Sequence, residues 1–136
     1  MTESVYETLI QVRYSETDQM KFVYYSRHFE YFEVARTECL AAWGFPYQEL
    51  EEKGYAIPVL EAHCEYLAPA RYGDALVVLT RASSIDRLRL RFDFETRRGG
   101  KDGTLIATGW TTHVCMDPSG KPRRPFKELA AKFDPS

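Results

Sequence analysis

The chain has 136 residues, 44% hydrophobic and 28% charged, so it suits one domain with a real core and is too short for two ordinary ones. Its formal net charge of −2 gives no broad basic surface, so nucleic acid is not an expected partner. Three widely spaced cysteines in apolar segments are typical of buried thiols in a reducing, cytoplasmic setting. No apolar run approaches a membrane span. We therefore expect a single domain over residues 1–136, with no membrane partner.

The first predicted elements are a strand and a long helix. Residues 6–14 alternate between apolar or aromatic and polar side chains, which predicts a strand. Ser26 can cap the helix that follows, because its hydroxyl can accept a hydrogen bond from an unpaired N–H of the first turn. Gly44 and Pro46 favour the end of this helix. Its apolar stripe consists of Phe29, Phe32, Cys39, Leu40 and Trp43.

The rest of the chain is predicted to be mainly strands. After a short helix at residues 47–53, runs with a period of two lie at residues 57–66, 75–85, 87–95 and 105–116. The segments at 86–87 and 97–103 are typical of hairpin turns, and residues 125–133 could form a short helix. Glu61, His63 and Glu65 share one strand face, but without a fourth ligand we predict no metal site.

These elements have the order β-α-β-β-β-β. Each strand has one apolar face, and the long helix is the only element large enough to cover such faces. The sequence therefore predicts an α+β domain in which a curved five-stranded antiparallel sheet wraps around one long helix.

Two segments resemble a known family. Residues 13–40, "RYSETDQMKFVYYSRHFEYFEVARTECL", resemble the opening motif of the hot-dog fold acyl-CoA thioesterases of the 4-hydroxybenzoyl-CoA thioesterase-like family, and residues 65–76, "EYLAPARYGDAL", resemble its second strand and turn. The resemblance implies the hot-dog fold and hydrolysis of an acyl-CoA thioester to the free acid and coenzyme A. It implies no separate cofactor, since coenzyme A is part of the substrate. It also implies a site at a homodimer interface, often within a dimer of dimers, here a homotetramer.

The resemblance also assigns residues. It maps the catalytic carboxylate of the family onto Asp18, and the helix-start residue whose backbone N–H polarises the thioester carbonyl onto Tyr25. We expect Tyr24 and His28 to bind substrate beside them. Arg87, at a turn, falls near where the family often has a basic residue for the nucleotide of coenzyme A.

The chemistry is consistent with these residue types. A thioester is an activated acyl group, so one ionised aspartate can serve as general base on water or as nucleophile. A helix N-terminus offers unpaired N–H groups and the positive end of its dipole to the developing oxyanion. On composition alone, Asp18 in "ETDQ" is an ordinary turn residue, and only the surrounding motif indicates catalysis.

Two other functions remain open. A hot-dog dehydratase or hydratase would need a catalytic histidine, and none of His28, His63 and His113 lies in the loop before the long helix. A non-catalytic acyl-CoA binding or interaction protein is favoured by Lys21, which stands where the family usually has glycine.

Overall fold

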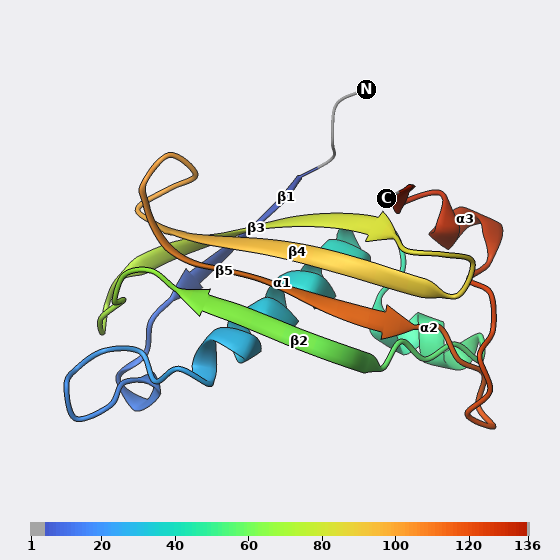
Figure 1. Ribbon diagram of the computed structural model, residues 1–136, viewed down its shortest axis with the longest axis horizontal. Coiled ribbons are helices and arrows are strands. Elements are labelled where there is room, and N and C mark those ends of the chain that lie inside the picture. Colours follow the sequence, from blue (N-terminus) through green and yellow to red (C-terminus); the bar gives the residue numbers. More distant parts are fainter. Residues whose placement is uncertain (1–4, 136) are drawn as a thin grey trace.

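The computed structural model describes residues 5–135, so residues 1–4 and 136 of the predicted domain lie outside the described part. Five long strands form an antiparallel sheet in the order β1-β3-β4-β5-β2, packed against helix α1 (Figure 1). The strands are β1 (Tyr6–Gln11), β2 (Val59–Tyr66), β3 (Ala75–Ser84), β4 (Arg89–Arg98) and β5 (Thr104–Val114). A two-residue strand, β6 (Asp134–Pro135), pairs in parallel with β3. The helices are α1 (Arg27–Ala42), α2 (Tyr47–Glu52) and α3 (Lys127–Ala130), with a 3-10 turn, η1 (Tyr14–Glu16). The predicted α+β architecture is confirmed.

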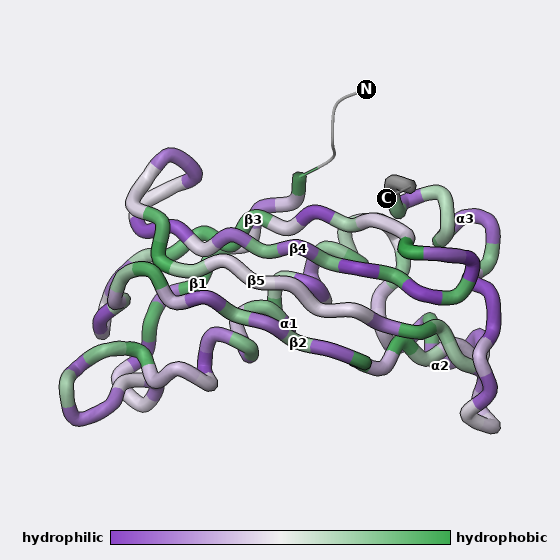
Figure 2. Tube along the Cα trace, in the orientation of Figure 1, coloured by the Kyte–Doolittle hydropathy of each residue, from purple (hydrophilic) through white to green (hydrophobic). Residues whose placement is uncertain are grey.

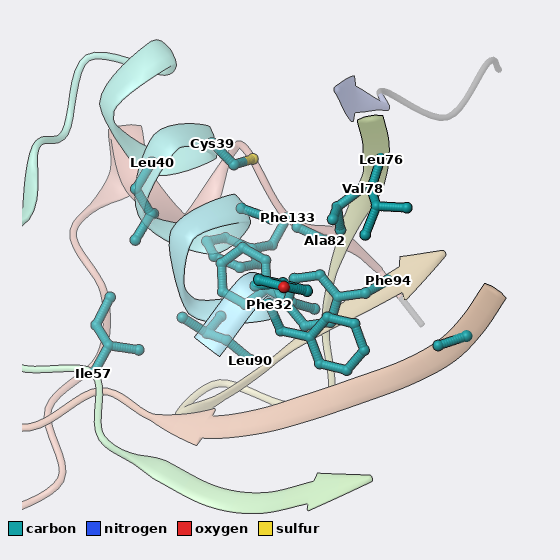
Figure 3. Packing of buried hydrophobic residues seen from close by; sticks show 14 of the residues in the cluster. Phe32, Cys39, Leu40, Ile57, Leu76, Val78, Ala82, Leu90, Phe94 and Phe133 are labelled. Carbon is teal, nitrogen blue, oxygen red and sulfur yellow. The ribbon is translucent and has the colours of Figure 1, made fainter. Parts of the chain in front are cut away.

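The core lies between α1 and the sheet. Alternation along β4 places Phe92 and Phe94 in the core, and Figure 2 shows the matching change between hydrophilic and hydrophobic residues along the strand. Phe32 of α1 stacks on Phe94 with ring centroids 4.5 Å apart (Figure 3). A Cβ at Gly109 of β5 would lie only 2.5 Å from the Phe32 ring. Glycine at this position therefore allows the helix to pack closely against the sheet.

The start of α1 differs from the prediction in one detail. Ser26 does precede the helix, but its side chain makes no capping hydrogen bond. Its backbone is helical, at φ −68° and ψ −21°, whereas a capping residue normally has an extended backbone. A helical turn already begins two residues earlier, because Arg27 N donates to the Tyr24 carbonyl.

Two strand predictions were wrong in part. β1 ends at Gln11, although Val12 still bonds to the neighbouring turn: its N–H donates to the Asp74 carbonyl and its carbonyl accepts from Gly73 N. Tyr14 then lies in η1 with 76% of its surface exposed. Strand β2 was expected to have one covered face, yet all of its residues except Cys64 are exposed. The reason is its place at the edge of the sheet, where it pairs with β5 alone.

The connection from β2 to β3 positions the site. Because these strands lie near opposite edges of the sheet, residues 67–74 cross its end. There the segment lies against residues 17–23: Val23 N donates to the Ala70 carbonyl at 2.8 Å, and Phe22 forms a bridge with Arg71. The start of α1 is at the same end of the molecule (Figure 1). None of the helices within residues 5–135 is long and apolar enough to cross a membrane.

Candidate active site

Asp18 begins a tight loop between the bridged residues Thr17 and Val23. Asp18 N donates to the Phe22 carbonyl at 2.8 Å, and Lys21 N donates to the Asp18 carbonyl at 2.9 Å. Lys21 has φ +69° and is the one non-glycine residue with positive φ within residues 5–135. A turn followed by a left-handed residue is a common hairpin geometry that favours glycine at the left-handed position. The loop geometry thus favours glycine at the position where this chain has Lys21.

The main chain of the loop orients the Asp18 carboxylate. Its Oδ1 accepts hydrogen bonds from Met20 N at 2.9 Å and Phe22 N at 3.2 Å. Within the described chain, no group donates a hydrogen bond to Oδ2. One oxygen is therefore held by the protein and the other remains available to a ligand or to water.

Two backbone donors lie at the start of α1. Among residues 5–135, no group accepts a hydrogen bond from the N–H of Tyr25 or from that of Ser26. The Tyr25 carbonyl is held from both sides, by His28 N at 3.3 Å and by the Tyr66 hydroxyl at 3.0 Å. These two contacts hold the peptide group that carries the Ser26 N–H. The peptide group of the Tyr25 N–H is held at the Tyr24 carbonyl, which accepts a hydrogen bond from Arg27 N at 2.8 Å. Unpaired N–H groups at a helix start can bind a negatively charged oxygen.

An open pocket of about 500 Å³ brings four predicted site residues together: Asp18, Tyr24, Tyr25 and His28 all line it. The remaining lining residues are mostly apolar: Met20, Phe22, Val23, Tyr66, Leu67, Ala68, Pro69 and Ala70. Sequence reasoning assigned none of these eight to the site. The signal was present in "EYLAPARYGDAL", which resembles a family motif, but only the fold shows that this segment forms a wall of the pocket.

His28 is an uncharged side chain in the pocket wall. It is 4% exposed, and its Nδ1 has no hydrogen-bond partner among the described residues. Its ring makes edge contacts with the rings of Tyr31 at 5.7 Å and Tyr66 at 5.3 Å. Burial lowers the pKa of His28 to about 4, so the imidazole is neutral at pH 7. His28 therefore offers the pocket a neutral ring rather than a positive charge.

Arg87 does not join this group within one chain. It is exposed in the turn between β3 and β4, near the end of the sheet where Val59 pairs with His113. Tyr66, which lines the pocket, lies at the other end of β2. At about 3.3 Å per residue, the strand separates the two ends by roughly 23 Å. Arg87 is thus remote from the pocket of its own chain.

The fold is that of a known class of protein. Slr0204, a 1,4-dihydroxy-2-naphthoyl-CoA thioesterase from Synechocystis, has the same hot-dog fold, with a TM-score of 0.88 over 96% of each chain and 23% sequence identity. Residues 12–133 match the thioesterase-like superfamily, and the chain belongs to that superfamily.

Curated relatives agree with this assignment. The acyl-CoA thioester hydrolase YbgC of Escherichia coli O6:H1 is 32% identical over 134 residues, which cover 98% of each chain. The putative acyl-CoA thioesterase YneP of Bacillus subtilis is 32% identical over 108 residues, covering 79% of this chain and 77% of YneP. The predicted family is confirmed, and with it the class of thioester hydrolases.

Proposed function

We propose that this protein hydrolyses an acyl-CoA thioester to the free acid and coenzyme A. The observation that carries the proposal is the pocket at the start of α1, which the Asp18 carboxylate and Tyr25 both line. The names of YbgC and YneP support the same substrate class. The pocket lining suits an acyl group, because it is mostly apolar and has few polar groups.

In the proposed mechanism, Asp18 acts through the oxygen that the loop does not hold. As a general base, Oδ2 takes a proton from water while the water oxygen bonds to the thioester carbon. As a nucleophile, Oδ2 bonds to that carbon itself, and water then hydrolyses the resulting anhydride. In both routes the Tyr25 N–H donates to the carbonyl oxygen as it becomes negative, and collapse of the tetrahedral intermediate breaks the carbon–sulfur bond and expels coenzyme A as its thiolate. The thiolate takes up a proton, which in the general-base route is the one that Asp18 took from water.

Tyr24 and His28 are proposed to contact the substrate rather than to react with it. Both line the pocket, and a neutral imidazole presents a polar ring without the cost of burying a charge. No cofactor beyond the coenzyme A of the substrate enters this mechanism.

A homodimer would account for Arg87. The edge strand β2 exposes apolar side chains, including Val59 at 47% and Leu60 at 52%, and an exposed apolar edge favours pairing with another chain. If two β2 strands pair antiparallel, the Val59 end of one lies beside the Tyr66 end of the other. The partner subunit's Arg87 would then approach this pocket, where it could hold a phosphate of coenzyme A. Further pairing of dimers into tetramers is part of the same proposal, and light scattering measures both states.

The test is a thiol-release assay with purified protein over short, long, branched and aromatic acyl-CoAs. We expect release of free coenzyme A from at least one class. Tight binding of coenzyme A with no thiol release from any substrate would instead support a non-catalytic binder. Hydration of crotonyl-CoA without thiol release would support a hydratase.

A further inference from the structure

Glu16 is a buried carboxylate two residues before Asp18, and it is only 7% exposed. Its Oε1 accepts hydrogen bonds from Arg13 N at 2.9 Å and from the Tyr31 hydroxyl at 2.9 Å, and its Oε2 accepts one from Arg13 Nε at 3.1 Å. Burial alone would raise the pKa of Glu16, but these hydrogen bonds hold it below its ordinary value. Glu16 is therefore ionised at neutral pH.

The main chain of Glu16 makes a second connection to the site. Its carbonyl accepts a hydrogen bond from Tyr24 N at 2.8 Å, immediately before Tyr25. Its side chain meanwhile binds Tyr31, one turn into α1. Glu16 lies just before the Asp18 loop. It thus connects this segment to Tyr24, which follows the loop, and to Tyr31 of helix α1.

The contacts of Glu16 continue to the pocket wall. The Tyr31 ring, fixed at its hydroxyl by Glu16, makes an edge contact with the His28 ring at 5.7 Å. His28 in turn contacts Tyr66, whose hydroxyl donates to the Tyr25 carbonyl. A shift of Glu16 would therefore move the groups that orient the helix start as well as the Asp18 loop.

Stability alone does not explain a carboxylate here. Removing a carboxylate from water is costly, and well-packed apolar residues often stabilise a protein as much as a buried ion pair or more. Directional hydrogen bonds from three donors do what apolar packing cannot, because they fix the orientation of the backbone around Glu16.

We propose that Glu16 is a positioning residue for the hydrolysis: it sets the Asp18 carboxylate relative to the Tyr25 N–H and does not itself touch the substrate. This role rests on the proposed function. Because a misplacement of about 1 Å can reduce the rate about a hundredfold, loss of these contacts should affect turnover more than binding.

The test compares Glu16→Gln and Tyr31→Phe with the wild-type enzyme. Glu16→Gln keeps an acceptor but loses the charge that pairs with Arg13, and we expect kcat to fall roughly 10- to 100-fold. Tyr31→Phe removes a single hydroxyl, and we expect a fall of roughly 3- to 10-fold. KM and the affinity for free coenzyme A should stay within about twofold, because the substrate contacts remain.

A further comparison separates positioning from folding. In an Asp18→Asn background, Glu16→Gln should cause no additional loss of the residual rate, since two residues that act as a unit are not additive. Asp117→Asn is the matched control: Asp117 also accepts three hydrogen bonds, from Ser119 N, Ser119 Oγ and Lys121 N, in a turn away from the pocket. It should lower the thermal midpoint and leave kcat unchanged.

Three results would overturn this role: unchanged kcat in the folded variants, equal losses in kcat and coenzyme A affinity, or a full additional loss in the Asp18→Asn background. If Glu16→Gln does not fold, Tyr31→Phe decides by the same criteria. An inactive wild-type protein would overturn the proposed function together with this role, whereas an active enzyme with unaffected variants overturns only the role of Glu16.

Discussion

Lys21 adopts a backbone conformation that suits glycine, so Lys21→Gly should stabilise the protein. Its φ of +69° costs a non-glycine residue about 1–2 kcal/mol. Replacing Lys21 by glycine removes this strain, but about 0.4–1 kcal/mol of the stabilisation is lost again because glycine makes the unfolded chain more flexible. The net stabilisation is about 0.5–1 kcal/mol. At about 2.1 cal/mol/K of unfolding entropy per residue, a chain of 136 residues should show a rise in Tm of about 2–4 °C.

Thermal unfolding followed by circular dichroism measures this shift. Lys21→Ala removes the charge but keeps the positive φ, so it should give no such rise. Gly73→Ala is the reverse control. Gly73 has φ +84°, and no atom lies within 4 Å of an added Cβ, so only the strained backbone matters and the free energy of unfolding should fall by about 1 kcal/mol. A rise with Lys21→Ala equal to that with Lys21→Gly would attribute the effect to charge and refute the conformational argument.

Two further perturbations test the core and the buried histidines. Gly109→Ala should destabilise the protein by about 1–3 kcal/mol, because the new methyl group overlaps both the His63 carbonyl oxygen and the Phe32 ring; a Tm equal to that of the wild type would contradict this packing. Burial lowers the pKa of both His28 and His113 to about 4, from an ordinary value of 6.5. Between pH 6.5 and 4 the unfolded chain therefore binds more protons than the folded one. The free energy of unfolding is highest above pH 6.5 and decreases as the pH falls toward 4, by up to about 3 kcal/mol per histidine. Urea unfolding at several pH values should show this slope, and a shallower one for His28→Phe; a flat profile would contradict the buried, neutral assignment.

The fold was largely predictable because its signals are local. The alternation along β4 and the turn residues around it fix a strand and its inward face without reference to the rest of the chain. β2 shows the limit of this reasoning. Its alternation resembles that of a half-buried strand, but burial depends on which strand ends at the edge of the sheet, and a single segment carries no such information.

The candidate site was predictable only for residues that lie within one sequence motif. Asp18, Tyr24, Tyr25 and His28 lie close together in sequence, and the structure places all of them in one pocket. Tyr66 was missed because its hydroxyl reaches the Tyr25 carbonyl from 41 positions away.

Glu16 was missed for a related reason. In the sequence it is one more polar residue in a turn, and its burial depends on Tyr31 approaching from the helix. Arg87 stays a prediction, since its distance from the pocket of its own chain makes its role depend on a second subunit.

The most direct test of the account is the turnover of Asp18→Asn on the best acyl-CoA of the panel. Asparagine keeps the Oδ1 acceptor for Met20 N and Phe22 N, so the loop should retain its shape while the charge is lost. We predict that kcat falls by about 10²- to 10⁴-fold, with an unchanged circular dichroism spectrum and an unchanged affinity for coenzyme A. Turnover within about threefold of the wild type in a folded Asp18→Asn protein would contradict the assignment of Asp18 as base or nucleophile.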